Sequence, residues 1–127
     1  MSRKMQGLNN KTGRKILVVG DDPLGVELIE EILSKDYDVE TAKDEGTMVT
    51  VEKTNPDLII IDRIVSVMND FGVCRQLKSN EKTRSIPVVV AAEIEDKRRA
   101  LEAGADDFLS KPISINELSA RVKSLLG

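Results

Sequence analysis

The stretch ILVVGDDPLGVELIEEIL, residues 16–33, changes its hydrophobic pattern at Gly20. Residues 16–19 form an uninterrupted aliphatic run, which is typical of a strand buried on both faces. Two acids follow Gly20, and then comes Pro23, a residue favoured in the first turn of a helix. Beyond it, apolar residues recur at helical spacing, at Leu24, Leu28, Ile29, Ile32 and Leu33. The stretch therefore predicts a strand followed by a helix, the repeating unit of an α/β fold.

The same alternation continues along the chain. Further short runs rich in β-branched or aliphatic residues occur at 37–39, 58–61, 88–90 and 107–109, with helical stretches between them. Five such units predict a single α/β domain with a parallel sheet over residues 15–127. Residues 1–14 are polar, basic and aperiodic, and we expect them to form a flexible N-terminal arm.

Composition excludes several classes of function. The chain has 127 residues, a net charge of −3 and 2% aromatic residues, which argues against a surface that binds nucleic acid directly. It has no histidine, which rules out Ser-His-Asp catalysis and histidine metal sites. Its single cysteine and the lack of a long apolar run predict a cytoplasmic protein with no membrane segment. The remaining chemistry must use carboxylates, lysine and backbone groups.

Charged residues follow three of the predicted strands. Asp21, Asp62 and Lys111 each stand where a strand ends, and the carboxyl ends of parallel strands meet at one edge of the sheet. Two carboxylates at such an edge suit Mg²⁺, which accepts one or two of them together with water and phosphate oxygens. The lysine would neutralise a phosphoryl oxygen, or pair with Asp62 when the site is empty.

Each acid also has a structural interpretation. Asp22 stands directly before Pro23, so a helix N-cap is favoured for it over a role as a metal ligand. Asp62 alone could equally be structural. It is the three positions together, each at a strand end, that argue for a site.

Four segments carry a resemblance to a known family. They are ILVVGDDP, NPDLIIID, SIPVVVAA and LEAGADDFLSKPI, of which the last is the most specific. Residues 15–126 resemble the receiver domain of bacterial two-component response regulators. The resemblance implies a flavodoxin-like (βα)5 sandwich, in which five helices flank a five-stranded parallel sheet of order 2-1-3-4-5.

The resemblance also implies roles for individual residues. Asp62 would be the phosphoacceptor and would take a phosphoryl group from a histidine kinase or a phosphotransfer protein. Asp21, Asp62 and the backbone carbonyl of Ile64 would bind Mg²⁺. Lys111 would coordinate the phosphoryl group, and the peptide bond to Pro112 would be cis. The chain would be a signalling module, not an enzyme.

Among the departures from the family pattern, two concern residues of the site itself. Gly20 occupies the place of the first residue of an acidic pair, so we expect weaker Mg²⁺ binding, with Asp22 a weak substitute one residue further on. Ala92 stands where the family has Thr or Ser, whose hydroxyl binds the phosphoryl group and lets an aromatic residue, here Phe108, change position. Alanine cannot make that bond, so we expect weak or absent switching.

These departures leave three hypotheses. The favoured one is an atypical receiver, with weakened or absent phosphorylation of Asp62, that serves as a docking or dimerisation module. The alternative is a conventional Mg²⁺-dependent phosphoacceptor. A remote alternative is a nucleotide-binding enzyme on a flavodoxin-like fold, although the loop 20–25 lacks the Lys-Ser/Thr of a phosphate loop.

The resemblance suggests a surface for a partner as well. A homodimer could form through the fourth helix, fifth strand and fifth helix, where the cations at 97–99 could meet Asp106 or Asp107. The chain ends soon after the last predicted helix, so we expect no output domain within it.

Overall fold

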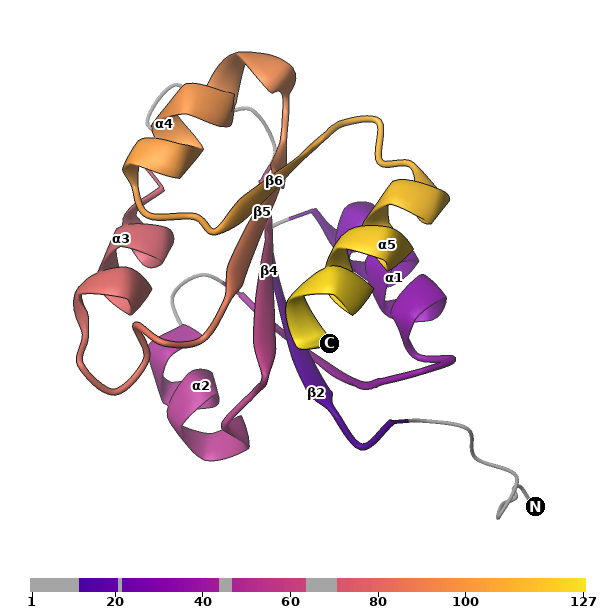
Figure 1. Cartoon of the computed structure of the whole chain (residues 1–127), viewed down its shortest axis with the longest axis horizontal. Coiled ribbons are helices and arrows are strands. Elements are labelled where there is room, and N and C mark those ends of the chain that lie inside the picture. The colour runs from indigo at the N-terminus through magenta and orange to yellow at the C-terminus, as the bar shows by residue number, and fades with distance from the viewer. Residues whose placement is uncertain (1–11, 21, 44–46, 64–70) are drawn as a thin grey trace.

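The structure is a computed structural model that describes residues 12–20, 22–43, 47–63 and 71–127. Strands and helices alternate along these residues, and a short 3-10 turn precedes the fourth helix (Figure 1). The elements are β2 (Lys15–Gly20), α1 (Pro23–Leu33), β3 (Asp38–Ala42), α2 (Thr47–Thr54), β4 (Leu58–Asp62), α3 (Gly72–Ser79), β5 (Val88–Ala92), η3 (Ile94–Asp96), α4 (Lys97–Glu102), β6 (Asp107–Ser110) and α5 (Ile115–Leu126). Among the described residues, no helix has the length and apolar character needed to cross a membrane.

All five described strands form one parallel sheet. Its order is β3-β2-β4-β5-β6, which confirms the predicted order 2-1-3-4-5. The register aligns the carboxyl ends of the three central strands, because Gly20 lies opposite Asp62 and Asp62 lies opposite Ala91. The prediction of a strand at 37–39 was wrong in its bounds. β3 lies at the sheet edge, where its polar, partly exposed residues pair with β2 as far as Ala42.

Helices cover both faces of the sheet, as Figure 1 shows with the sheet nearly edge-on: α1 and α5 lie on one face, and α2, α3 and α4 on the other. Alternate residues of each strand enter the two cores. Leu17 and Ile59 pack with Cys74 of α3, whereas Val18 and Ile60 pack with Leu118 of α5. This double burial explains why the central strands are apolar at every position.

Helix α1 buries only part of the predicted stripe. Leu24 is 79% exposed and Leu28 is 45% exposed, whereas Ile29 and Leu33 are buried. Val26 packs against the core in place of the two exposed leucines. The sequence pattern was too wide, because only Ile29, Ile32 and Leu33 of the five predicted residues pack in this core.

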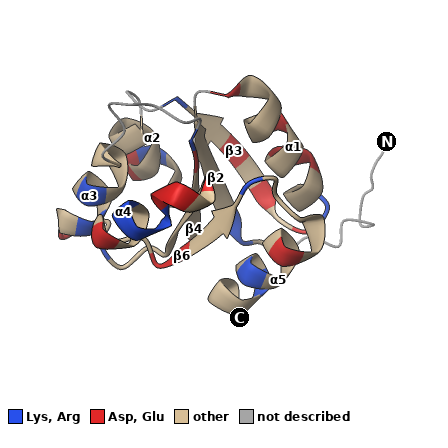
Figure 2. Ribbon diagram, turned by 90° about the horizontal axis from the view of Figure 1, so that it is seen from above, with Lys and Arg blue, Asp and Glu red and all other residues tan. Residues whose placement is uncertain are grey.

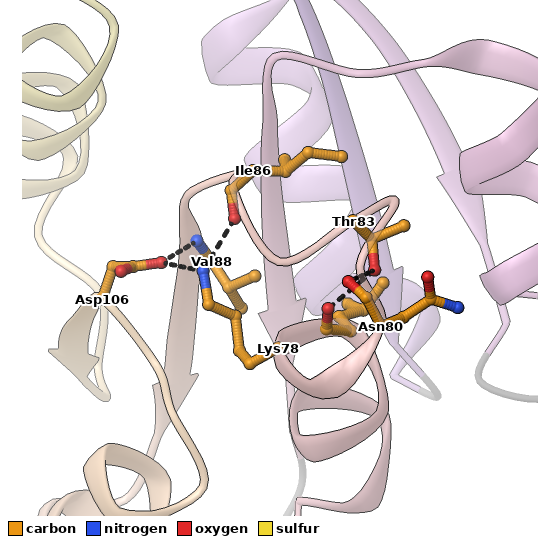
Figure 3. Close-up of polar contacts among 7 residues, drawn as sticks. Lys78, Asn80, Thr83, Ile86, Val88 and Asp106 are labelled. Atoms are coloured by element: carbon orange, nitrogen blue, oxygen red, sulfur yellow. Dashed lines mark hydrogen bonds and ion pairs between the residues drawn. The ribbon is translucent and has the colours of Figure 1, made fainter.

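Polar contacts hold the opposite end of the sheet together (Figure 3). Lys78 Nζ lies 2.9 Å from Asp106 Oδ2 and donates to the carbonyl of Ile86 at 3.0 Å. The same Asp106 oxygen accepts a hydrogen bond from the backbone N–H of Val88 at 2.8 Å. In turn, the backbone N–H of Asp106 donates to the carbonyl of Val88. These bonds join α3, the start of β5 and the connection between α4 and β6, far along the strands from the predicted site.

Candidate functional site

Asp62 is the last residue of β4, the central strand of the sheet, and its side chain is fully buried. Three isoleucines precede it, and all three are buried in the two cores. Neighbouring strands flank it on both sides, with Gly20 opposite on β2 and Ala91 on β5. The sheet therefore holds this carboxylate at its carboxyl edge with little freedom to move.

Lys111 follows β6 and reaches the same carboxylate. Its Nζ lies 2.5 Å from Asp62 Oδ1, and its side chain is 18% exposed. The backbone N–H of Lys111 donates to the carbonyl of Ala92 at 2.9 Å, which fixes the lysine beside the end of β5. The Lys111–Pro112 peptide bond is cis, as predicted. The expected pairing of Lys111 with Asp62 is thus present.

Among the described residues, the second oxygen of Asp62 has no hydrogen-bond partner. Oδ2 is buried, and no described residue donates a hydrogen bond to it. Burial raises the pKa of the Asp62 carboxyl above its ordinary value, the Lys111 ammonium acts in the opposite direction, and the nearby Asp22 carboxylate raises the pKa further. A buried carboxylate oxygen without a donor is a costly arrangement that a cation or a proton would relieve.

Two glycines pack directly around Asp62. A Cβ atom at Gly20 would lie 2.6 Å from the Asp62 carbonyl oxygen and 3.0 Å from Val26 Cγ2. A Cβ atom at Gly25, in the first turn of α1, would overlap Asp62 Oδ2. Sequence reasoning missed Gly25 as part of the site; the only available signal was a second glycine inside a helical pattern, where glycine is normally unfavourable.

Asp22 is the N-cap of α1, as predicted. Its Oδ1 accepts from the backbone N–H of Leu24 at 3.2 Å. Its other oxygen, Oδ2, would lie 3.0 Å from a Cβ atom at Gly25, on the side of α1 that faces Asp62. Asp22 therefore serves as a cap and still lies beside the site.

The other predicted site residues divide into two groups. Ala92 and Phe108 are buried in the core beneath α2, α3 and α4. Asp21 and Ile64 lie outside the described residues. Over the described ranges, no group of three or more acidic or cysteine side chains is placed to hold a metal. The free oxygen of Asp62 is nevertheless the hard oxygen donor that Mg²⁺ prefers, and Mg²⁺ needs only one or two carboxylates.

A comparison with protein families matches the "Response regulator receiver domain" profile to residues 16–123. The chain belongs to this family. Its relatives are response regulators: the receiver is 42% identical over 116 residues to response regulator PleD of Caulobacter vibrioides and 40% identical over 116 residues to the alkaline phosphatase synthesis transcriptional regulatory protein PhoP of Bacillus subtilis. These matches cover 87% and 89% of the receiver but only 26% and 48% of the two relatives. The receiver thus spans half or less of the length of these proteins.

Solved structures share the receiver fold. The signal receiver domain of a histidine kinase from Syntrophus aciditrophicus is 35% identical, with a TM-score of 0.80 and coverage of 90% of each chain. The receiver domain of a sensor histidine kinase from Pseudomonas aeruginosa PAO1 is 26% identical, with a TM-score of 0.80 and coverage of 91% of this receiver and 99% of that chain. That second structure has a magnesium ion coordinated in its active-site cleft.

Proposed function

We propose that this receiver is atypical: Asp62 is its phosphoacceptor position, phosphorylation and switching are weakened or absent, and the domain acts mainly by docking or dimerisation. The observation that carries the proposal is Ala92. It is buried at the end of β5, beside the strand that ends in Asp62, and it has no hydroxyl to offer a phosphoryl oxygen. A hydrogen bond to a charged group contributes about 1.5–3 kcal/mol. Its absence would lower the equilibrium constant between the inactive and the active conformation by about tenfold or more.

The residues at the site retain parts of the phosphoryl-transfer machinery. An Asp62 oxygen would attack the phosphorus of a phosphohistidine donor, and the phosphorus–nitrogen bond would break as the phosphorus–oxygen bond forms. Lys111 would neutralise charge on the transferred group from its position beside Oδ1. Asp62, Asp21 and the carbonyl of Ile64 would hold Mg²⁺, which supplies charge neutralisation at the phosphoryl oxygens.

The second candidate function is a conventional Mg²⁺-dependent phosphoacceptor. The Asp62–Lys111 pair favours it, because the acceptor and its cationic partner lie 2.5 Å apart with the acceptor fixed at a strand end. A histidine kinase or a phosphotransfer protein would then be the phosphodonor. The PleD and PhoP relatives, both regulators, support this class of partner.

Mass spectrometry of the intact protein separates the two candidates. The receiver is incubated with acetyl phosphate and Mg²⁺ or EDTA, beside Asp62→Asn and the receiver domain of PleD as a conventional reference. The atypical receiver is expected to gain little or no phosphoryl mass under conditions that modify the reference. A Mg²⁺-dependent adduct of one phosphoryl group at the reference rate, absent in Asp62→Asn, would instead establish the conventional function.

A second measurement addresses Ala92 directly. Ala92→Thr restores a hydroxyl at the buried end of β5. If the missing hydroxyl limits switching, the variant should show larger backbone amide NMR shifts on addition of beryllium fluoride, a phosphoryl mimic, than the unmodified receiver. Equal shifts in the two proteins would count against this part of the proposal.

The docking surface that we propose is the α4–β6–α5 face. A hollow of about 600 Å³ on α4 is lined by exposed Ile94 and Leu101 together with Lys97 and Arg98. Figure 2 shows blue positions on α4 and α5, with red positions beside them on both helices, and red positions on α1 and β3. Sedimentation velocity of Arg98→Glu and Leu101→Glu tests a homodimer here. An unchanged oligomeric state in both variants would reject it.

A further inference from the structure

Two carboxylate oxygens lie close together beside Gly25, and no described residue donates a hydrogen bond to either of them. Asp62 Oδ2 and Asp22 Oδ2 both lie against the place that a Cβ atom of Gly25 would occupy. One oxygen comes from the end of β4 and the other from the residue that caps α1. The two side chains therefore converge from different elements on a single point.

Neither oxygen is used elsewhere in the described chain. Asp62 Oδ2 is buried and has no described hydrogen-bond donor, while Lys111 contacts the opposite oxygen, Oδ1. Asp22 makes its cap bond to Leu24 through Oδ1, which leaves Oδ2 on the side of the site. The cap and the site thus use different oxygens of one carboxylate, and the two roles do not compete.

Electrostatics makes this arrangement unfavourable unless positive charge joins it. Two carboxylates a few ångströms apart repel each other, and the repulsion grows as water is excluded from one of them. Lys111 carries a single positive charge and contacts Oδ1 of Asp62, the oxygen that does not approach Asp22. A divalent cation that contacts both Oδ2 atoms, directly or through water, would neutralise the pair with the oxygen ligands that Mg²⁺ prefers.

We propose that Asp22, through Oδ2, is a ligand of the divalent cation at Asp62, either directly or through a water molecule. Gly25 contributes by lacking a side chain, because a Cβ atom there would overlap Asp62 Oδ2 and crowd Asp22 Oδ2. The proposal rests on the proposed function in that it concerns the cation of the same site. It adds Asp22 as a ligand, one residue after Asp21 in the sequence.

The test is cation binding by isothermal titration calorimetry with Mg²⁺, and with Mn²⁺ by electron paramagnetic resonance, in the absence of any phosphodonor. Asp22→Asn is the informative variant, because asparagine caps helices as well as aspartate does and only the charge is lost. Glu31→Gln is the matched control: it removes the same charge from an exposed position later in α1. We expect Asp22→Asn to raise the Kd for both ions by about tenfold or more, and Glu31→Gln to leave it unchanged.

Thermal unfolding without the cation separates a lost ligand from a damaged helix. Asp22→Asn should melt at the same temperature as the unmodified receiver or slightly higher, since the cap is kept and a repulsion is removed. Adding Mg²⁺ should then raise the melting temperature of the unmodified receiver and of Glu31→Gln more than that of Asp22→Asn. Should Asp22→Asn fold poorly, Asp22→Ser keeps a capping oxygen without the charge and serves for the same comparison.

Gly25→Ala tests the space itself. Its Cβ atom would overlap Asp62 Oδ2 and lie 3.0 Å from Asp22 Oδ2, which displaces the Asp62 oxygen, so cation binding should weaken as it does in Asp22→Asn. The proposal is overturned if Asp22→Asn binds both ions as tightly as the unmodified receiver, or if the unmodified receiver binds neither ion at millimolar concentration. Neither result depends on phosphorylation, so the presence or absence of an acetyl phosphate adduct bears on the proposed function alone.

Discussion

Replacing Lys111 with methionine should destabilise the receiver through the carboxylate that it leaves behind. Methionine retains most of the aliphatic stem, so the main change is loss of the ammonium 2.5 Å from Asp62 Oδ1. The partner is fully buried, and its other oxygen already lacks a described donor. Removing one member of a buried ion pair costs about 3–5 kcal/mol, and full burial of Asp62 places this site in that range at pH 8.

The cost should depend on pH with a definite sign. Burial raises the pKa of Asp62 above 3.8, and Lys111 works against that rise, so the pKa must increase further when the lysine is removed. A carboxyl group with a higher pKa in the folded state binds its proton more tightly there than in the unfolded chain. Its contribution to stability therefore decreases as the pH rises from 3.8 through the folded-state pKa. The free energy of unfolding of Lys111→Met should fall more steeply from pH 5 to pH 8 than that of the unmodified receiver.

Urea denaturation followed by far-UV circular dichroism measures this, since the chain has no tryptophan and one tyrosine. Lys123→Met, on α5, is the control for loss of a positive charge away from the site. Asp62→Asn should recover most of the lost stability when it is combined with Lys111→Met, because no buried charge remains. The reasoning is refuted if Lys111→Met costs less than about 1 kcal/mol at pH 8, below the range for a broken buried pair, or if the double variant is no more stable than Lys111→Met.

Other positions give simpler expectations. Asp106→Ala leaves the N–H of Val88 and the ammonium of Lys78 without their shared acceptor, so equilibrium denaturation should show a loss of about 1–3 kcal/mol. Cys74 is buried, and burial raises the pKa of its thiol to about 11. An aromatic disulfide reagent at pH 8 should therefore label it in urea but scarcely at all in the folded receiver. Fast labelling of the folded protein would show that the thiol is accessible. Ser114→Ala removes the oxygen that caps α5 and should cost about 1 kcal/mol, whereas Ser114→Asn should cost little.

The strands and their order illustrate what could be predicted from the sequence. Runs of apolar residues identified the three central strands, because burial on both faces requires an apolar residue at nearly every position. The edge strand β3 was placed least well, since partial exposure allows polar residues there and weakens the pattern. Asp62 and Lys111 were both found from their places at strand ends, where a parallel sheet brings such residues together.

The amphipathic pattern of α1 shows where sequence reasoning failed. Five apolar residues share a broad face of the helix, but a helix packed on a sheet touches it along a line, and only Ile29 and Leu33 of the five are fully buried. Which part of a broad apolar stripe is covered depends on how the helix is rotated about its axis. That rotation is set by packing against β2 and β3, to which α1 makes its contacts, and the helix sequence does not encode it alone.

The sequence by itself determined the fold class, the sheet order implied by the family motifs, the N-cap at Asp22 and the residues at the strand ends. These follow from local patterns, since hydrophobic period, capping and the position of a charge after a strand are all properties of short segments. The tertiary structure alone decided how the site is packed. It brought Gly25 of α1 against the carboxylate at the end of β4 and turned the second oxygen of Asp22 toward the same point. Distances between segments far apart in the chain depend on how the helix packs on the sheet. Because the interior is close-packed, the volume of each side chain at that contact affects the positions of the others.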